Sequence, residues 1–250
     1  MVPSGDLHGR PGRPADRVGR VRSLLGTWRR WAWWLLVACV AVVAALGVAF
    51  AHQATADGFD RVLDDPVISW LGPHRDLLYW MEYPGTQVPA IVASLAMAAA
   101  CLPGRRLNGA VLALVADFIA TRLDDSVLKY LFHRTYLGAL SYPSGHTTSI
   151  VALTAVYVVL FILPPDGAWA IRRGQPVRHG WSARGWPRWL GLAVLLALLV
   201  ITVLGVIALR WHYFTDTIGG AAVALGVVSA LCLLIDALWA RPRARPAPAK

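Results

Sequence analysis

Six long apolar blocks set the strongest constraint on how this chain can fold. They cover approximately residues 31–51, 86–103, 108–130, 147–164, 189–209 and 217–239. Each block has about the length that an α-helix needs to cross roughly 30 Å of hydrocarbon. The blocks lack the strict alternation of apolar and polar residues that a transmembrane β-barrel shows. We therefore expect an all-α, polytopic membrane protein with six transmembrane helices.

The distribution of basic residues predicts how these helices are oriented. The chain has 24 Lys and Arg against 14 Asp and Glu, a net charge of +10. Most of the basic residues lie in residues 1–30, at 105–106, in residues 165–188 and after residue 240. These positions alternate along the six-span path with an acidic loop over residues 52–85, and positive charge is retained on the cytoplasmic side. We expect both termini to be cytoplasmic and the acidic loop to face outward.

The composition also divides the chain into segments. Residues 1–30 are rich in Gly, Pro and Arg, which is typical of a disordered basic arm. Residues 31–240 then form the membrane domain, and residues 241–250 form a basic cytoplasmic tail. A membrane surface explains the basic termini better than nucleic acid does. The three cysteines lie inside apolar blocks, which favours packing over a disulfide or a metal site.

A turn at the start of the fourth apolar block carries residues that a plain membrane helix does not need. Pro143 fixes the turn, Ser144 can cap a helix, and Gly145 allows close approach of a ligand to the backbone. His146 follows directly. Free N–H groups and the helix dipole favour an anion at such a helix start. The alternative is a simple helix cap with an incidental histidine.

Two cations precede this turn. Lys129 stands out because the only other lysine in the chain is the terminal Lys250. Lys129 and Arg134 flank the outer end of the third block, on the side where basic residues are scarce. We interpret both as phosphate ligands, with snorkelling of long basic side chains at the membrane interface as the alternative.

The third cluster lies between the fifth and sixth blocks. His212 and Asp216 are four residues apart, so they meet whether the backbone is helical or turns there. A carboxylate that binds one ring nitrogen fixes the tautomer and makes the other nitrogen a better nucleophile. The alternatives are a helix N-cap at Asp216 and an interfacial aromatic ring at His212.

The predicted topology brings the three clusters to one membrane face, where together they suit phosphoryl transfer. One histidine attacks the phosphorus, and the other protonates the leaving oxygen. The cations and backbone amides stabilise the phosphoryl oxygens. We expect no cofactor and no metal, because the sequence has no metal-ligand spacing.

These clusters, in this order, resemble the type 2 phosphatidic acid phosphatase family, whose catalytic core is similar to that of vanadium haloperoxidases. The resemblance covers roughly residues 85–240 and implies a helical core of that type. It also implies that His212 is the nucleophile, that Asp216 orients it, and that His146 is the general acid. The phosphate would be held by Lys129, Ser144 and the amide of Gly145.

The chain departs from the family pattern at two places. Seven residues after its lysine the family usually has Arg-Pro, where this chain has Tyr136 and Leu137. Shortly before the last histidine the family usually has Ser-Arg, where this chain has Gly205 and Val206. Arg210 is our candidate for the missing cation. A helix would point Arg210 away from His212, so this role requires that the backbone has already left the helix.

We therefore predict a membrane phosphatase that hydrolyses a lipid phosphate or diphosphate at the outer face of the cell membrane. The substrate would be a polyprenyl lipid or a phospholipid whose tail stays in the bilayer, with no nucleic-acid partner. The Arg- and Ala-rich composition favours a bacterial, cell-envelope polyprenyl substrate. The main alternative is a non-catalytic transporter or scaffold with a degenerate phosphate site. Haloperoxidase chemistry suits the membrane setting less well.

Overall fold

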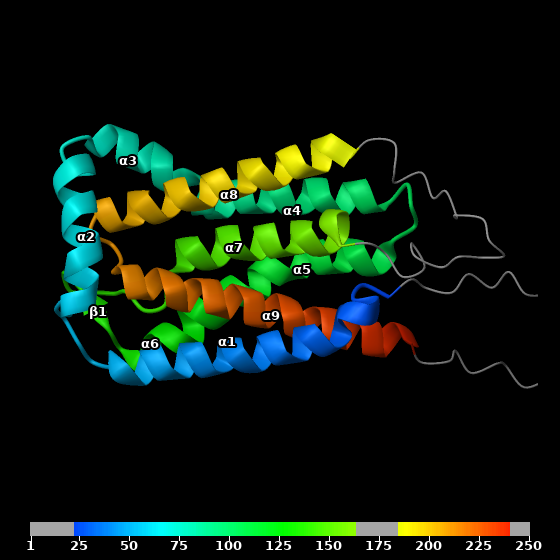
Figure 1. Cartoon of the computed structure of the whole chain (residues 1–250), viewed down its shortest axis with the longest axis horizontal. Helices are drawn as coiled ribbons and strands as arrows, with labels where there is room; N and C mark the ends of the chain where they lie inside the picture. The colour runs from blue at the N-terminus through cyan, green and yellow to red at the C-terminus, as the bar shows by residue number, and fades with distance from the viewer. Residues whose placement is uncertain (1–22, 164–184, 241–250) are drawn as a thin grey trace, which may run out of the picture.

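The computed structural model describes residues 23–163 and 185–240, which form a bundle of long helices lying side by side (Figure 1). The predicted basic arm up to residue 22, the basic loop over 164–184 and the tail over 241–250 lie outside the described residues. A short 3-10 turn, η1 (Gly26–Trp28), leads directly into the first long helix, α1 (Arg29–Ala49).

The other elements follow α1 in chain order. They are α2 (Gly58–Leu71), α3 (Arg75–Glu82), the 3-10 turn η2 (Tyr83–Gly85), α4 (Gln87–Cys101), α5 (Leu107–Leu123), the π-helical segment η3 (Asp124–Leu128), α6 (Lys129–Phe132), β1 (Thr135–Tyr136), β2 (Ala139–Leu140), α7 (Gly145–Tyr157), the π-helical segment η4 (Val158–Ile162), α8 (Gly185–Ala208) and α9 (Phe214–Ala240). The two short strands pair as an antiparallel hairpin.

All six predicted apolar blocks are helical, and the all-α polytopic membrane fold is confirmed. In the described part of the chain, five helical segments are long and apolar enough to cross a membrane. They are Gly26–Ala49, Arg75–Cys101, Gly145–Ile162, Gly185–Ala208 and Phe214–Trp239. The third predicted block is the continuous helical segment α5–η3–α6, which carries five charged side chains. The count of six spans therefore stays a prediction.

The acidic loop over residues 52–85 contains two helices that the sequence analysis did not predict, α2 and α3. The side chain of Asp57 caps α2 by accepting a bond from the backbone N–H of Asp60 at 2.7 Å. Figure 1 shows α2 lying across one end of the bundle, with α3 packed against α8. The two helices thus help to enclose the end of the bundle at which the predicted site residues gather.

Helix α9 is central to the packing, since it contacts α1, α5 and α7. Small side chains allow these helices to approach each other closely, as is common in membrane bundles. Buried examples from three of the helices are Ala113, Ala116, Ala152 and Ala224. This packing holds the start of α7 against the start of α9, where the predicted site residues lie.

The N-terminal arm was predicted to extend to residue 30, but residues 23–30 are part of the folded bundle. The carboxylate of Asp236 near the end of α9 accepts bonds from Ser23 Oγ at 2.6 Å, Leu24 N at 2.7 Å and Leu25 N at 3.1 Å. Backbone N–H groups at the start of a helix have no acceptor within the helix, and the Asp236 carboxylate serves as their acceptor. The predicted boundary was too late because this acceptor lies more than 200 residues away in the sequence.

The ends of the described segments, near residues 23, 163, 185 and 240, lie at the opposite end of the bundle from α2 and β1 (Figure 1). The points at which the described chain joins these segments therefore lie away from the predicted site. Which end faces the cytoplasm stays a prediction that rests on the distribution of charge.

Candidate active site

A pocket of about 760 Å³ lies between the turn that begins α4, the η3–α6 segment, the β1–β2 hairpin, the start of α7 and the α8–α9 turn. Five of the eight predicted site residues line it: Lys129, Gly145, His146, Arg210 and His212. The other three, Arg134, Ser144 and Asp216, are completely buried. The structure thus brings the predicted clusters together but divides them between the pocket and its supporting wall.

His212 lies in the turn between α8 and α9, and its ring is almost buried although it lines the pocket. Its Nδ1 atom is 2.8 Å from the backbone oxygen of Ser141. A carbonyl can only accept a hydrogen bond, so Nδ1 carries the proton and the lone pair lies on Nε2. Burial, helped by the positive charge of Lys129, lowers the pKa of His212 to about 3. The ring is therefore neutral at ordinary pH, as a nucleophile requires.

Asp216 does not hold His212 by the direct hydrogen bond that we expected. Its Oδ2 atom is 3.9 Å from Nδ1 of His212, beyond hydrogen-bonding distance. Oδ2 instead accepts the backbone N–H of Tyr213 at 2.9 Å. Asp216 therefore fixes the turn that carries His212, while the Ser141 carbonyl sets the tautomer. The sequence does not indicate this role of Ser141, because every residue has a carbonyl.

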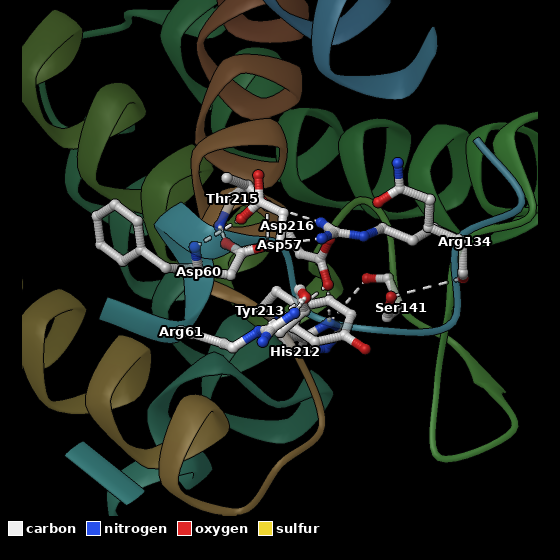
Figure 2. Close-up of polar contacts among 12 residues, drawn as sticks. Asp57, Asp60, Arg61, Arg134, Ser141, His212, Tyr213, Thr215 and Asp216 are labelled. Carbon is white, nitrogen blue, oxygen red and sulfur yellow. Dashed lines mark hydrogen bonds and ion pairs between the residues drawn. The ribbon is translucent and has the colours of Figure 1, made fainter. Parts of the chain in front are cut away.

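Arg134 does not line the pocket, and Figure 2 shows its guanidinium directed toward Asp216 and Asp60. Its Nη1 atom donates to Oδ1 of Asp216 and to Oγ1 of Thr215, both at 2.6 Å. Its Nη2 atom donates to Oδ2 of Asp60, also at 2.6 Å. Both Nη atoms thus bind carboxylates or a hydroxyl, Nε has no hydrogen-bond partner among the described residues, and the side chain has no exposed surface. The predicted role of Arg134 as a phosphate ligand does not fit this placement.

Two aromatic rings complete the surroundings of Arg134. The central guanidinium carbon lies 4.3 Å from the ring centre of Phe50 and 4.2 Å from that of Tyr213. Such cation–π contacts are strongest when the charge is removed from water, as it is here. Arg134 is therefore a structural residue that fastens the wall of the site.

Asp60 of α2 joins this network from outside the bundle. Its carboxylate accepts bonds from the backbone N–H of Thr215 and from Oγ1 of Thr215, each at 3.0 Å. The first N–H groups of a helix have no intrahelical acceptor, so Asp60 caps α9 from a different helix. Asp64, one turn further along α2, is also buried, and burial next to Asp60 raises its pKa to about 7. Neither residue was among the predicted site residues, because the burial of both carboxylates depends on packing between segments that are distant in sequence.

Ser144 acts as the cap of α7, which was the alternative interpretation of this residue. Its hydroxyl accepts the backbone N–H of Thr147 at 3.4 Å, and its own N–H donates to the backbone oxygen of Asp216 at 3.0 Å. The serine therefore ties the start of α7 to the start of α9. Its side chain is buried and does not line the pocket. Gly145, the next residue, does line the pocket, as predicted for a phosphate ligand.

Lys129 stands beside Gly145. A Cβ atom added to Gly145 would lie 3.6 Å from Lys129 Nζ. Lys129 follows the π-helical segment η3, an irregularity that often marks functional sites in helices. Its ammonium group pairs with Asp125 Oδ1 at 2.6 Å, and Asp125, which is not among the predicted site residues, also lines the pocket. A bound phosphate would have to share Lys129 with this carboxylate.

Arg210 lies at the position where α8 ends. The N–H of Arg210 bonds to the carbonyl of Ile207 at 2.9 Å, and the N–H of Trp211 bonds to that of Val206 at 3.0 Å. This pair of bonds is the Schellman motif, in which Arg210 adopts the left-handed conformation with φ of 59°. The backbone has thus left the helix before Arg210, which was the condition we set for its role. Arg210 is exposed and lines the pocket.

His146 is in the first turn of α7, with its ring centre 6.1 Å from that of His212. Its Nε2 atom is 3.1 Å from Oε2 of Glu82, the last residue of α3. The ring of Trp211 lies 5.6 Å away, centre to centre. The two histidines therefore share one pocket, and the sequence analysis did not anticipate the carboxylate beside His146.

The profile of one protein family matches this chain. The PAP2 superfamily matches residues 109–240, which is more than half of the 250 residues. The chain belongs to the PAP2 superfamily. The family resemblance that the sequence motifs indicated is therefore confirmed. No curated protein and no solved structure shows a significant match to the chain.

All eight predicted site residues lie inside the PAP2 match, whereas α2 and α3 lie before it. The structure gives a physical account of one departure from the usual PAP2 motifs. Val206 has no exposed surface, so the position where the family usually has an arginine faces the packed interior here. Arg210, four residues after Val206 in the sequence, places a cation in the pocket instead. Tyr136 and Leu137, at the other departure, line the pocket.

Proposed function

We propose that this PAP2 protein is a membrane phosphatase that hydrolyses a lipid phosphate or diphosphate through a phosphohistidine on His212. The observation that carries the proposal is the 2.8 Å contact between His212 Nδ1 and the Ser141 carbonyl. It leaves Nε2 with a free lone pair on a neutral ring that lines the pocket. Lys129 and Gly145 line the same pocket, where they would stabilise the phosphoryl oxygens.

The proposed reaction has two steps. In the first, His212 Nε2 attacks phosphorus, the bond from phosphorus to the leaving oxygen breaks, and His146 gives a proton to that oxygen. In the second, a water molecule attacks the phosphohistidine, the P–N bond breaks, and His146 takes the proton of the water. Inorganic phosphate and the dephosphorylated lipid are the products. Neither step requires a metal ion.

The setting of the pocket favours a lipid substrate. It lies at the end of a bundle of apolar helices, so a polyprenyl or acyl tail can stay in the bilayer while the phosphate enters the pocket. The distribution of basic residues favours the outer face of the cell membrane for this end. The arginine- and alanine-rich composition favours a polyprenyl substrate of the cell envelope.

The competing proposal is a non-catalytic transporter or scaffold. Two observations favour it: Val206 replaces a usual motif cation, and Lys129 already pairs with Asp125. A test is to reconstitute the purified protein in vesicles and measure phosphate release from lipid monophosphates and diphosphates, with and without a chelator. Turnover that persists in chelator and disappears in His212→Ala supports the phosphatase. A folded wild-type protein that releases no phosphate from any lipid of the panel favours the alternative.

A further inference from the structure

A carboxylate outside the family match stands next to the proposed general acid. Glu82 ends α3 and is buried, and its Oε2 atom lies 3.1 Å from Nε2 of His146. The contact is within ion-pair distance but lacks hydrogen-bond geometry, and this oxygen has no hydrogen-bond partner among the described residues. A buried carboxylate needs a partner, because desolvating an unpaired charge is costly. Protonated His146 is a cation within reach of Glu82 and can supply that partner.

Two close backbone approaches bring Glu82 to this position. Gly205 lies in α8, and a Cβ atom there would be 2.9 Å from Met81 Cβ and 3.1 Å from the backbone nitrogen of Glu82. Gly85 follows α3, and a Cβ atom there would be 2.9 Å from the backbone oxygen of His146. A side chain at either position would push α3 away from α7 and α8. Glycine is the residue that permits such contacts.

Gly205 connects this geometry to the altered motif. It occupies a position at which the family usually has serine, so the departure has a structural consequence in this chain. Without a side chain at position 205, α3 packs directly on α8, and Glu82 reaches the ring of His146. The ring of Trp211 also lies near the ring of His146, with 5.6 Å between the two ring centres. The imidazole is thus fixed by α3 and by the α8–α9 turn.

We propose that Glu82 is a positioning residue for His146 and that Gly205 makes this role possible. The inference rests on the proposed phosphatase function. In this proposal the proton on Nε2 stays beside Glu82, 3.1 Å away, and Nδ1 is the nitrogen that transfers protons. Protonated His146 gives the Nδ1 proton to the leaving oxygen as the P–O bond breaks, and it keeps the Nε2 proton toward Glu82. Nδ1 then takes the proton of the attacking water.

The test compares two leaving groups. An alkoxide from dodecyl phosphate needs a proton to leave, whereas p-nitrophenolate leaves without one. The ratio kcat/KM reports the steps up to P–O cleavage and therefore isolates the proton transfer to the leaving group. We expect Glu82→Ala to lower kcat/KM for dodecyl phosphate by ~10–100-fold, part of the ~10²–10⁴ that general acid catalysis supplies. For p-nitrophenyl phosphate we expect less than about a threefold change, since no general acid is needed.

Three further variants make the result specific. Glu82→Gln keeps an oxygen that can face Nε2, so we expect it to recover most of the loss. Gly205→Ser keeps the Glu82 side chain but moves α3 away from α8, so we expect it to reproduce the dependence on leaving group. Asp76→Ala removes an exposed acid from the same helix and serves as the control with unchanged rates.

An equal loss for both substrates in Glu82→Ala and Glu82→Gln would show a merely structural role and overturn the inference. Unchanged rates in Glu82→Ala would overturn it as well. If Glu82→Ala does not fold, the leaving-group dependence of Gly205→Ser decides the question. Failure of the proposed function looks different, because the wild-type protein would then hydrolyse neither substrate.

Discussion

Arg134 Nη1 donates to Oδ1 of Asp216 across 2.6 Å, and neither side chain has any exposed surface. The other oxygen of Asp216 accepts the N–H of Tyr213, the residue directly after His212. The guanidinium therefore stabilises the turn that presents the proposed nucleophile, although it never reaches the pocket. Removing one partner of a buried ion pair leaves an uncompensated charge, which typically costs about 3–5 kcal/mol.

We expect Arg134→Ala to destabilise the protein by an amount of that order and to abolish turnover. Arg134→Lys will not rescue it, because one ammonium group cannot reproduce the planar fork that meets Asp60, Thr215 and Asp216. Unfolding temperature in detergent and phosphate release measure the two effects. Arg61→Ala, which removes an exposed arginine of α2, is the matched control. A stable Arg134→Ala protein with only a raised KM would restore the phosphate-ligand role that the sequence suggested.

Arg210 offers a way to separate stability from activity. A non-glycine residue in the left-handed region is strained by roughly 1–2 kcal/mol, part of which glycine relieves. We expect Arg210→Gly to gain about 0.5–1 kcal/mol of stability and to lose ~10²–10³ in rate, the usual effect of removing a donor to a developing charge. The measurements are thermal unfolding and kcat on one lipid phosphate.

The chain offers a matched control for this change. Arg105 is also exposed, has φ of 50°, and does not line the pocket. Arg105→Gly should gain similar stability at unchanged rate. Full activity in Arg210→Gly would remove Arg210 from the phosphate site.

The local features of this protein were predictable, whereas the pairings between distant segments were not. The apolar blocks and the turn from Pro143 to His146 are patterns within a few consecutive residues, and each has a direct physical meaning. The pairing of Arg134 with Asp60 spans 74 residues, and no local pattern records it. In sequence, a cation that binds phosphate looks the same as a cation that binds buried carboxylates. The structure places Arg134 among buried carboxylates and not among the residues that line the pocket.

Glu82 and Ser141 were missed for related reasons. Glu82 reaches His146 only because Gly205 lets two helices touch, which depends on the packing of the whole bundle. Ser141 contributes a backbone carbonyl to His212, and the identity of its side chain is irrelevant to that contact. For Arg210 the sequence supplied only a condition, that the backbone has left the helix, and the left-handed conformation of Arg210 at the end of α8 meets it.

Asp64 gives a prediction for stability against pH. Burial next to Asp60 raises its pKa from the ordinary value near 4 to about 7, and neither oxygen has a hydrogen-bond partner among the described residues. The folded state therefore binds this proton more tightly than the unfolded state does. Its contribution to stability is complete below pH 4 and is lost as the pH rises through 7.

Asp64→Asn removes this titration. We expect the stability of the variant relative to the wild-type protein to increase between pH 5 and pH 8, as measured by thermal unfolding in detergent. Asp65→Asn, at the exposed neighbouring residue, is the control and should change neither value. A stability difference that is the same at both pH values would contradict the raised pKa of Asp64.

His212 titrates in the opposite sense, because burial lowers its pKa from 6.5 to about 3. The attacking nitrogen is therefore unprotonated down to low pH, and protonation of His212 will reduce kcat/KM only as the pH approaches 3.

In the unfolded chain the histidine binds a proton near pH 6.5, so the stability that depends on its neutral form is complete above pH 6.5. That stability is lost progressively as the pH falls toward 3. Between pH 7.5 and 4.5, the unfolding free energy of the wild-type protein should fall more steeply than that of His212→Gln, whose side chain does not titrate. Two results would contradict this prediction: parallel stability curves for the two proteins, or a fall of kcat/KM near pH 6.5 that is traced to His212. Either result would show that the ring is hydrated. The proposed attack requires a ring that is desolvated and neutral.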